Sequence, residues 1–279
     1  LIFFLFLKIF FKNIGGGGGG GFRAPTPQNP ADTSGPAANK QQQRYVMDTI
    51  SIDCKHSTKI IAHRGLSGLE CENTLPAFIA AGSRTYWGVE CDVHVTSDGK
   101  YVVMHDDSTA RMCTVDCIIE NTDFATLRSL EFKNADAVIP TLDEYLAVIK
   151  EYNKTAVVEL KNHMEEGDIK NIVSACLGCL PPEKLVIISF DFENLVTVRR
   201  LFPAQCVQYL TGEWEEGLPD KLVQNGFDLD IHYSFLTKER ISLLHSRGIS
   251  VNCWTCDDPS AAARLAEDGV DFITTNILE

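Results

Sequence analysis

Acidic residues with alternate spacing mark two apolar segments of the chain. The apolar segments 87–95 and 155–160 are both predicted to be strands. The first contains Glu90 and Asp92; the second contains Glu159 and is followed directly by Lys161. Strand side chains alternate between faces, so Glu90 and Asp92 share one face with polar surroundings. Three carboxylates converging there cannot all stay ionised without compensation. A hard divalent cation with oxygen ligands is the simplest compensation.

Histidines and basic residues follow other apolar segments. His63 and Arg64 come directly after segment 59–62, and His105 ends segment 101–105. Two imidazoles that titrate near neutrality suit proton transfer to and from a reacting group. Arg64 and Lys161 would offset the charge of an anionic substrate and of its transition state. Trp254 ends another apolar segment and is either barrel core or a wall of the substrate pocket.

The elements that carry these residues recur with a nearly constant period. Apolar runs begin every 21 or 22 residues, at Leu185, Cys206, Phe227, Ile249 and Val270. Each step holds one strand, one short helix and two loops. With segments 59–62, 87–95 and 155–160 this gives eight strands alternating with helices. The pattern predicts an α/β fold, a (β/α)₈ TIM barrel, with an open doubly wound sheet as the alternative.

Two parts of the chain do not follow this period. Residues 101–105 and 110–138 form a short insertion after the second strand, and only four residues follow Thr275. The eighth helix is therefore missing or supplied by another segment. Residues 1–46 combine a short apolar run, seven consecutive glycines and a linker-like composition, so we expect a disordered or non-native segment there. The barrel domain is expected to span residues 47–279.

Composition limits the partners. The formal net charge of −13 disfavours nucleic acid, and the apolar run at residues 1–11 is shorter than the roughly 20 residues of a membrane span. We therefore expect a small-molecule substrate, no nucleic-acid partner and no stable membrane insertion. Ten cysteines without a disulfide-like spacing indicate a reducing, cytoplasmic location. The oligomeric state cannot be deduced from these features.

Eight short motifs in this order resemble the glycerophosphodiester phosphodiesterase family. They are His63-Arg64-Gly65, Glu72-Asn73-Thr74, Glu90-x-Asp92-Val93, Thr96-x-Asp98-Gly99, His105-Asp106, Ile139-Pro140-Thr141-Leu142, Val158-Glu159-Leu160-Lys161 and Trp254-Thr255. The resemblance implies a barrel that hydrolyses glycerophosphodiesters to glycerol 3-phosphate and an alcohol, using Ca²⁺ or Mg²⁺.

The resemblance also implies roles for individual residues. It makes His63 and His105 the general base and acid, without deciding which is which. The phosphate contacts would be Arg64 and Lys161. The metal ligands would be Glu90, Asp92 and Glu159. Two departures stand out: Cys71 replaces the family's usual proline, and Thr275-Asn276-Ile277 replaces its usual Thr-Asp-Tyr-Pro ending. The second departure could blunt catalysis or substrate fit.

Other interpretations remain open for these residues. A glycosidase with a Glu90/Glu159 pair in the same barrel would leave both histidines idle. A barrel could also bind a phosphorylated ligand without turnover. Glu159 and Lys161 could form only a structural ion pair, and Asn73 or Thr74 is expected to be first a helix N-cap. His94 could line the site or pack, whereas we interpret four further histidines as structural: His56, His163, His232 and His245.

Overall fold

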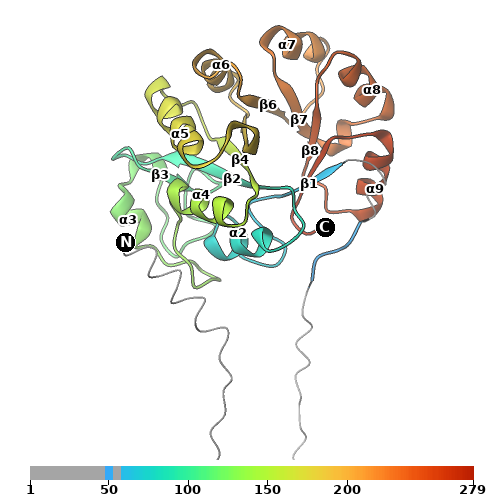
Figure 1. Cartoon of the computed structure of the whole chain (residues 1–279). Coiled ribbons are helices and arrows are strands. Elements are labelled where there is room, and N and C mark those ends of the chain that lie inside the picture. The colour runs from blue at the N-terminus through green and yellow to red at the C-terminus, as the bar shows by residue number, and fades with distance from the viewer. Residues whose placement is uncertain (1–47, 53–57) are drawn as a thin grey trace, which may run out of the picture. The chain divides into compact units, whose positions relative to one another are not determined.

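Eight parallel strands close into a barrel in the computed structural model, which describes residues 48–52 and 58–279 (Figure 1). The ring runs in the order β1-β9-β8-β7-β6-β5-β4-β2, and β1 pairs with β2 to close it. The strands are β1 (Lys59–Ala62), β2 (Gly88–Val95), β4 (Thr155–Leu160), β5 (Leu185–Ser189), β6 (Cys206–Thr211), β7 (Asp228–His232), β8 (Val251–Trp254) and β9 (Phe272–Thr275). The predicted (β/α)₈ barrel is confirmed. The expectations for residues 1–46 and for His56 lie outside the described residues.

Helices connect successive strands and cover the outside of the barrel (Figure 1). Thr141 and Glu144 form a capping box at the start of α4, and Asp258 caps a helix that begins with Pro259. The helices are α2 (Leu75–Gly82), α4 (Leu142–Glu151), α5 (Glu166–Cys179), α6 (Phe192–Leu201), α7 (Leu218–Asn225), α8 (Lys238–Ser246) and α9 (Pro259–Asp268). Two short 3₁₀ turns, η2 (Pro182–Lys184) and η3 (Tyr233–Phe235), flank β5 and β7.

Strand alternation divides apolar from acidic side chains, as the sequence indicates. Apolar residues of β2 join the main core between barrel and helices, whereas the carboxylates of β2 face the barrel interior. A separate apolar cluster fills the interior toward the amino ends of the strands. It contains Ile61, Val157, Val186, Ile188 and Leu210. Because Glu159 follows Val157 by two residues on β4, the acidic groups lie toward the carboxyl ends, where barrel sites are found.

The insertion after β2 has a core of its own. Strand β3 (Tyr101–Val103) pairs antiparallel with β2 and is followed by η1 (Ile119–Asn121) and α3 (Phe124–Arg128). Eight buried residues hold this region together: Val102, Met104, Cys113, Ile119, Leu127, Leu130, Phe132 and Ile139. Although β3 ends at Val103, the N–H of Met104 still donates to Asp92 O at 3.1 Å. His105 is thereby held against the barrel.

The end of the chain closes the barrel without a final helix among the described residues. After β9, the backbone of Ile277 and Glu279 pairs with Ile50 at N–O distances of 3.0 and 2.8 Å. Ile52 donates to Glu279 O at 2.8 Å. A short extended segment, residues 48–52, therefore runs beside the chain end and fixes the position of the loop that contains Asn276.

Candidate active site

Three buried carboxylates meet inside the barrel. Glu90 and Asp92 come from β2 and Glu159 from β4, and one oxygen of each lies within 4.8 Å of the others. Asp92 and Glu159 are direct partners in the strand register. Their side chains have exposed fractions of 2, 1 and 6%. The parallel register of two neighbouring strands thus brings together the residues that the sequence predicts as metal ligands.

The charges in this cluster are only partly balanced. Lys161 Nζ lies 2.8 Å from Glu159 Oε1 and 3.4 Å from Asp92 Oδ1. The ion pair between Glu159 and Lys161, one of the interpretations of the sequence, is therefore present. Burial raises the pKa of Glu90 well above its ordinary value, and repulsion from Asp92 and Glu159 adds to this. Burial acts on Asp92 as well, but attraction to Lys161 and Arg64 outweighs it and holds the pKa of Asp92 below its usual range.

The cluster has the composition of a site for a hard cation. Glu90 Oε1 and Asp92 Oδ1 are buried and accept no hydrogen bond. Buried carboxylate oxygens without a donor are costly, and a bound divalent ion removes that cost. An all-oxygen set suits Ca²⁺ and Mg²⁺ alike. Glu90, Asp92 and Glu159 therefore fit the divalent cation that the family resemblance implies.

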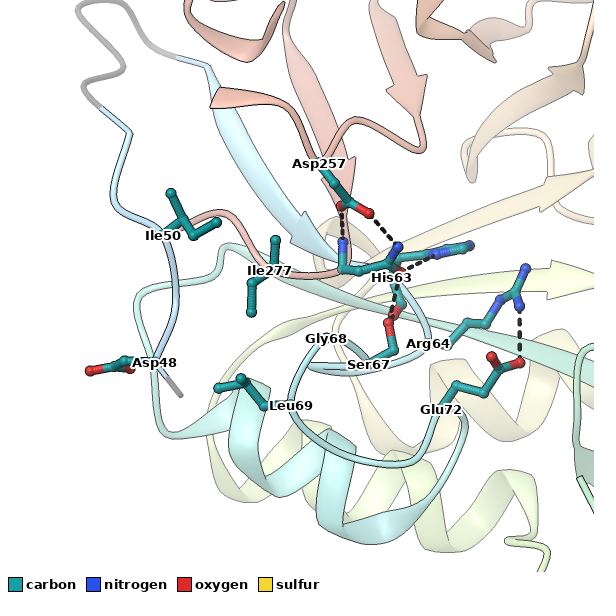
Figure 2. A pocket seen from close by; sticks show the side chains of 11 residues that line it. Asp48, Ile50, His63, Arg64, Ser67, Gly68, Leu69, Glu72, Asp257 and Ile277 are labelled. Carbon is teal, nitrogen blue, oxygen red and sulfur yellow. Dashed lines mark hydrogen bonds and ion pairs between the residues drawn. The ribbon is translucent and has the colours of Figure 1, made fainter. Parts of the chain in front are cut away.

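A tight turn after β1 aims Arg64 at this cluster. Arg64 has a φ of +54° and Gly65 a φ of +75°. A Cβ at Gly65 would lie 2.6 Å from the backbone carbon of Ala77, so only glycine fits. The turn lets the Arg64 N–H donate to Glu90 Oε2 at 2.7 Å. The Arg64 guanidinium lies 2.9 Å from Glu72 (Figure 2). It also lies 3.5 Å from Asp92.

Asn73 has a different task from the one expected. Thr74 occupies the N-cap position of α2, but its hydroxyl donates to Cys71 O at 2.6 Å and caps nothing. Asn73, also at positive φ, donates from Nδ2 to Asp92 Oδ2 at 2.7 Å. The expected N-cap is therefore Thr74, which has the cap position without a side-chain cap hydrogen bond, whereas Asn73 serves the buried carboxylate of Asp92. Asn73 orients a candidate metal ligand.

His63 follows β1 directly and has a neutral partner. Its Nδ1 lies 2.8 Å from Asn276 Oδ1, in the segment where the chain departs from the family ending. Burial, together with the neighbouring charge of Arg64, lowers the pKa of His63 to about 4. The His63 ring is therefore uncharged at neutral pH and can accept a proton.

His105, in contrast, has a carboxylate partner. Its Nδ1 lies 2.6 Å from Asp106 Oδ1, and Arg111 Nε lies 2.6 Å from the other oxygen of Asp106. Arg111 also contacts Glu72 at 2.7 Å, which links the insertion to the loop after β1. Sequence reasoning missed Arg111. One signal in the sequence pointed to such a residue: Asp106 directly follows His105, and a carboxylate that pairs with a histidine needs a further partner to hold it in place.

A cavity of about 550 Å³ opens beside His63 and Arg64 (Figure 2). Its walls include the loop after β1, residues 48 and 50, and the loops after β8 and β9. None of the three clustered carboxylates lines it.

Trp254, at the end of β8, packs edge-on against Phe190 and His232 with ring centres 5.5 and 5.4 Å apart. Its substrate contact stays a prediction.

The remaining described histidines pair with local groups. His94 is fully buried, with Nε2 3.5 Å from His105 O, so it packs behind the site. His163 and His245 pair with Asp191 and Asp271 at 3.0 and 2.8 Å. His232 Nδ1 bonds to the Ser234 hydroxyl at 2.7 Å.

Among the described residues, no helix combines the length and apolar character needed to cross a bilayer.

Comparisons with known proteins agree with this arrangement. Residues 63–279 match the model of the glycerophosphoryl diester phosphodiesterase family. A glycerophosphodiester phosphodiesterase of Caldanaerobacter subterraneus is 27% identical over 231 residues, which cover 78% of this chain and 94% of that protein.

Solved structures show the same relationship. A phosphodiesterase of Oleispira antarctica, solved with the product sn-glycerol-3-phosphate, is 30% identical with a TM-score of 0.74, over 81% of this chain and 96% of that one. A glycerophosphodiester phosphodiesterase of Parabacteroides distasonis is 31% identical with a TM-score of 0.70, over 79% and 93%. The chain belongs to the glycerophosphoryl diester phosphodiesterase family.

Proposed function

We propose that this chain hydrolyses glycerophosphodiesters to glycerol 3-phosphate and an alcohol, with a divalent cation held by Glu90, Asp92 and Glu159. The observation that carries the proposal is the buried trio, in which two oxygens lack any hydrogen-bond donor. Family membership and the product bound to the Oleispira antarctica relative support the substrate class. Both favour phosphodiester cleavage over glycoside hydrolysis or ligand binding without turnover.

The basic residues of the site suit an anionic substrate. Arg64 and Lys161 lie against the carboxylate cluster, and their side chains remain partly accessible at 17 and 12%. Guanidinium and ammonium groups there can bind the phosphoryl oxygens and stabilise charge that develops during cleavage. When bound, Ca²⁺ or Mg²⁺ would supply Lewis-acid stabilisation of the phosphoryl group.

The two histidines divide the proton transfers. His63, uncharged and next to an amide, is assigned as the general base that accepts a proton from the attacking hydroxyl group. His105 is assigned as the general acid, because the Asp106 carboxylate accepts from Nδ1 at 2.6 Å and orients the ring so that Nε2 can donate a proton.

The alcohol and the cellular location are further parts of the proposal. Trp254 and Phe190 offer an aromatic wall for the departing alcohol, since Phe190 remains 47% exposed.

All nine cysteines within the described residues are unpaired, which supports a reducing, cytoplasmic setting.

Release of glycerol 3-phosphate from glycerophosphocholine tests the proposal. Excess chelator should abolish release, and added Ca²⁺ or Mg²⁺ should restore it. Glu159→Gln should lose both activity and bound metal, measured by elemental analysis. Asp228→Asn is the matched control, because Asp228 is a partly buried carboxyl at the start of β7 that already accepts a hydrogen bond from the Ser250 backbone N–H. Full release in excess chelator by protein that contains no metal would overturn the proposed cation.

A further inference from the structure

A chain of hydrogen bonds runs behind His63 from the loop after β8 to the loop after β9 (Figure 2). Asp257 accepts from the backbone N–H of Asn276 at 2.7 Å and from its Nδ2 at 2.6 Å. Asn276 Oδ1 in turn lies 2.8 Å from His63 Nδ1. No motif in the sequence marks Asp257, and the family resemblance assigns it no role. Its position behind a catalytic candidate calls for an explanation.

We propose that Asp257 is a positioning residue that acts through Asn276 to fix the tautomer of His63, with the proton on Nδ1 and a lone pair on Nε2. The inference rests on the proposed function, because it explains how His63 can serve as the base. It also gives a purpose to the asparagine that replaces the family's usual aspartate at position 276.

The first step concerns the orientation of the Asn276 amide. An ionised carboxylate only accepts hydrogen bonds, so the group that faces Asp257 Oδ2 must be the NH₂ of Asn276. The amide oxygen then necessarily faces His63. Ser67 Oγ lies 2.7 Å from the same amide oxygen and 2.8 Å from the carbonyl oxygen of His63, and its single proton can serve either acceptor, so the orientation rests on Asp257. Asp257 is itself held by the Thr275 hydroxyl at 2.8 Å.

The second step concerns the imidazole. An amide oxygen only accepts, so the His63 nitrogen 2.8 Å away must carry the proton. In a neutral ring with Nδ1 protonated, Nε2 is the acceptor. The opposite tautomer would leave two acceptors facing each other and would place the proton on the nitrogen needed for catalysis. Asp257 therefore determines which nitrogen of His63 is basic.

The third step concerns charge. The carboxylate of Asp257 contacts Asn276 rather than the imidazole, so His63 receives orientation without a directly bonded anion. Burial is the largest cause that lowers the pKa of His63 to about 4; the charges of Arg64 and His105 lower it further, and the charge of Asp92 opposes them. A direct carboxylate partner would have the opposite effect. The relay thus combines a fixed tautomer with an uncharged ring.

Nitrogen-15 NMR of the full chain in Ca²⁺ or Mg²⁺ buffer tests the tautomer without any assay of activity. The wild type should show His63 Nδ1 with the shift of a protonated nitrogen and Nε2 with that of an unprotonated one. Asp257→Asn replaces one carboxylate oxygen by an NH₂ group, which favours a flipped Asn276 amide with its oxygen toward residue 257, and should shift the population toward the other tautomer. A wild-type ring with the proton on Nε2 would overturn the proposal even if every variant failed to fold.

Activity measurements give the second readout. Asp257→Asn should lower kcat by roughly 10²–10⁴-fold, the range for loss of a general base. The matched control is Asp258→Asn, which makes the same change at the neighbouring residue. Asp258 only caps α9, and asparagine caps equally well, so kcat and the His63 spectrum should stay unchanged.

A charge swap separates a relay from a structural role. Asn276→Asp combined with Asp257→Asn keeps a hydrogen bond between the two side chains with its direction reversed, keeps an acceptor for His63 Nδ1, and moves the carboxylate into contact with His63. This double variant should regain kcat to within about tenfold of wild type, as expected for strongly coupled residues. The acidic limb of its kcat/KM profile should move to higher pH. No recovery by a folded double variant, or an unchanged tautomer and kcat in Asp257→Asn, would overturn the proposal.

Discussion

The loop after β1 and the insertion after β2 each present a histidine to the site, and the two regions surround it differently. His63 is backed by an amide that belongs to the last loop of the barrel, and its strand is part of the closed ring. His105 stands outside the ring and is backed by Asp106, which a salt bridge to Arg111 holds in place. One ring has a neutral partner and the other an anionic partner.

This difference bears on the proposed roles of the two rings. A neutral amide orients a ring without placing a charge beside it, whereas a carboxylate orients a ring and places a negative charge beside it. The last loop of the barrel supplies the first environment, and the insertion supplies the second through its own ion pairs. The proposed base and the proposed acid thus differ in the partner of Nδ1.

The largest expected effect comes from removing either ring. His63→Ala and His105→Ala should each lower the turnover of glycerophosphocholine by roughly 10²–10⁴-fold, the usual range for lost acid or base catalysis. Folding should change little, because both side chains lie at the barrel mouth rather than in the core. Turnover and circular dichroism are the measurements. Near-normal turnover of either variant would make that histidine structural.

A smaller effect is expected from Arg111, which positions the acid without being assigned to the reaction. Arg111→Gln releases Asp106 and Glu72, so kcat should fall by about 10–100-fold, as for other orienting partners. Arg200→Gln is the matched control, since Arg200 forms an exposed 2.8 Å ion pair with Glu166 on the outer helices. Equal kcat values for the two variants would show that the insertion does not orient His105.

The smallest effect concerns mild acid. A base must be deprotonated to act, so activity should be present above the pKa of His63 and be lost as the pH falls through about 4. An ordinary histidine would lose its basic form near pH 6.5. We therefore expect kcat/KM of the wild type at pH 5.5 to stay close to its neutral value. An acidic limb centred near pH 6.5 would show that Arg64 and burial do not control this ring.

Much of the barrel and of its acidic cluster could be predicted from the sequence. The period of 21 or 22 residues reflects a regular strand–helix unit, and strand alternation by itself places Glu90 and Asp92 on one face. Glu159 joins them because the neighbouring strand is parallel and in register. Such features depend on local pattern and on the topology of a barrel, both of which a single sequence contains.

The partners of the histidines could not be predicted in the same way. Arg111 lies in the insertion, where the period fails, and contacts Glu72 at a separation of 39 residues. Asp257 is found only once the loops after β8 and β9 are placed side by side. The orientation of the Asn276 amide is a property of the whole hydrogen-bond chain. Asn276, in the substituted ending, contacts His63, and the expected effect of that ending on catalysis or substrate fit stays a prediction.

The dependence of each histidine variant on the leaving group tests the division of labour most directly. Turnover should be compared for glycerophosphocholine and for the 4-nitrophenyl ester of glycerol phosphate, whose leaving group departs without a proton. His105→Ala should recover to within about tenfold of wild type on the nitrophenyl ester, whereas His63→Ala should remain roughly 10²–10⁴-fold slower on both substrates. Recovery of His63→Ala instead of His105→Ala, or equal losses on both substrates, would contradict the assignment of His63 as base and His105 as acid.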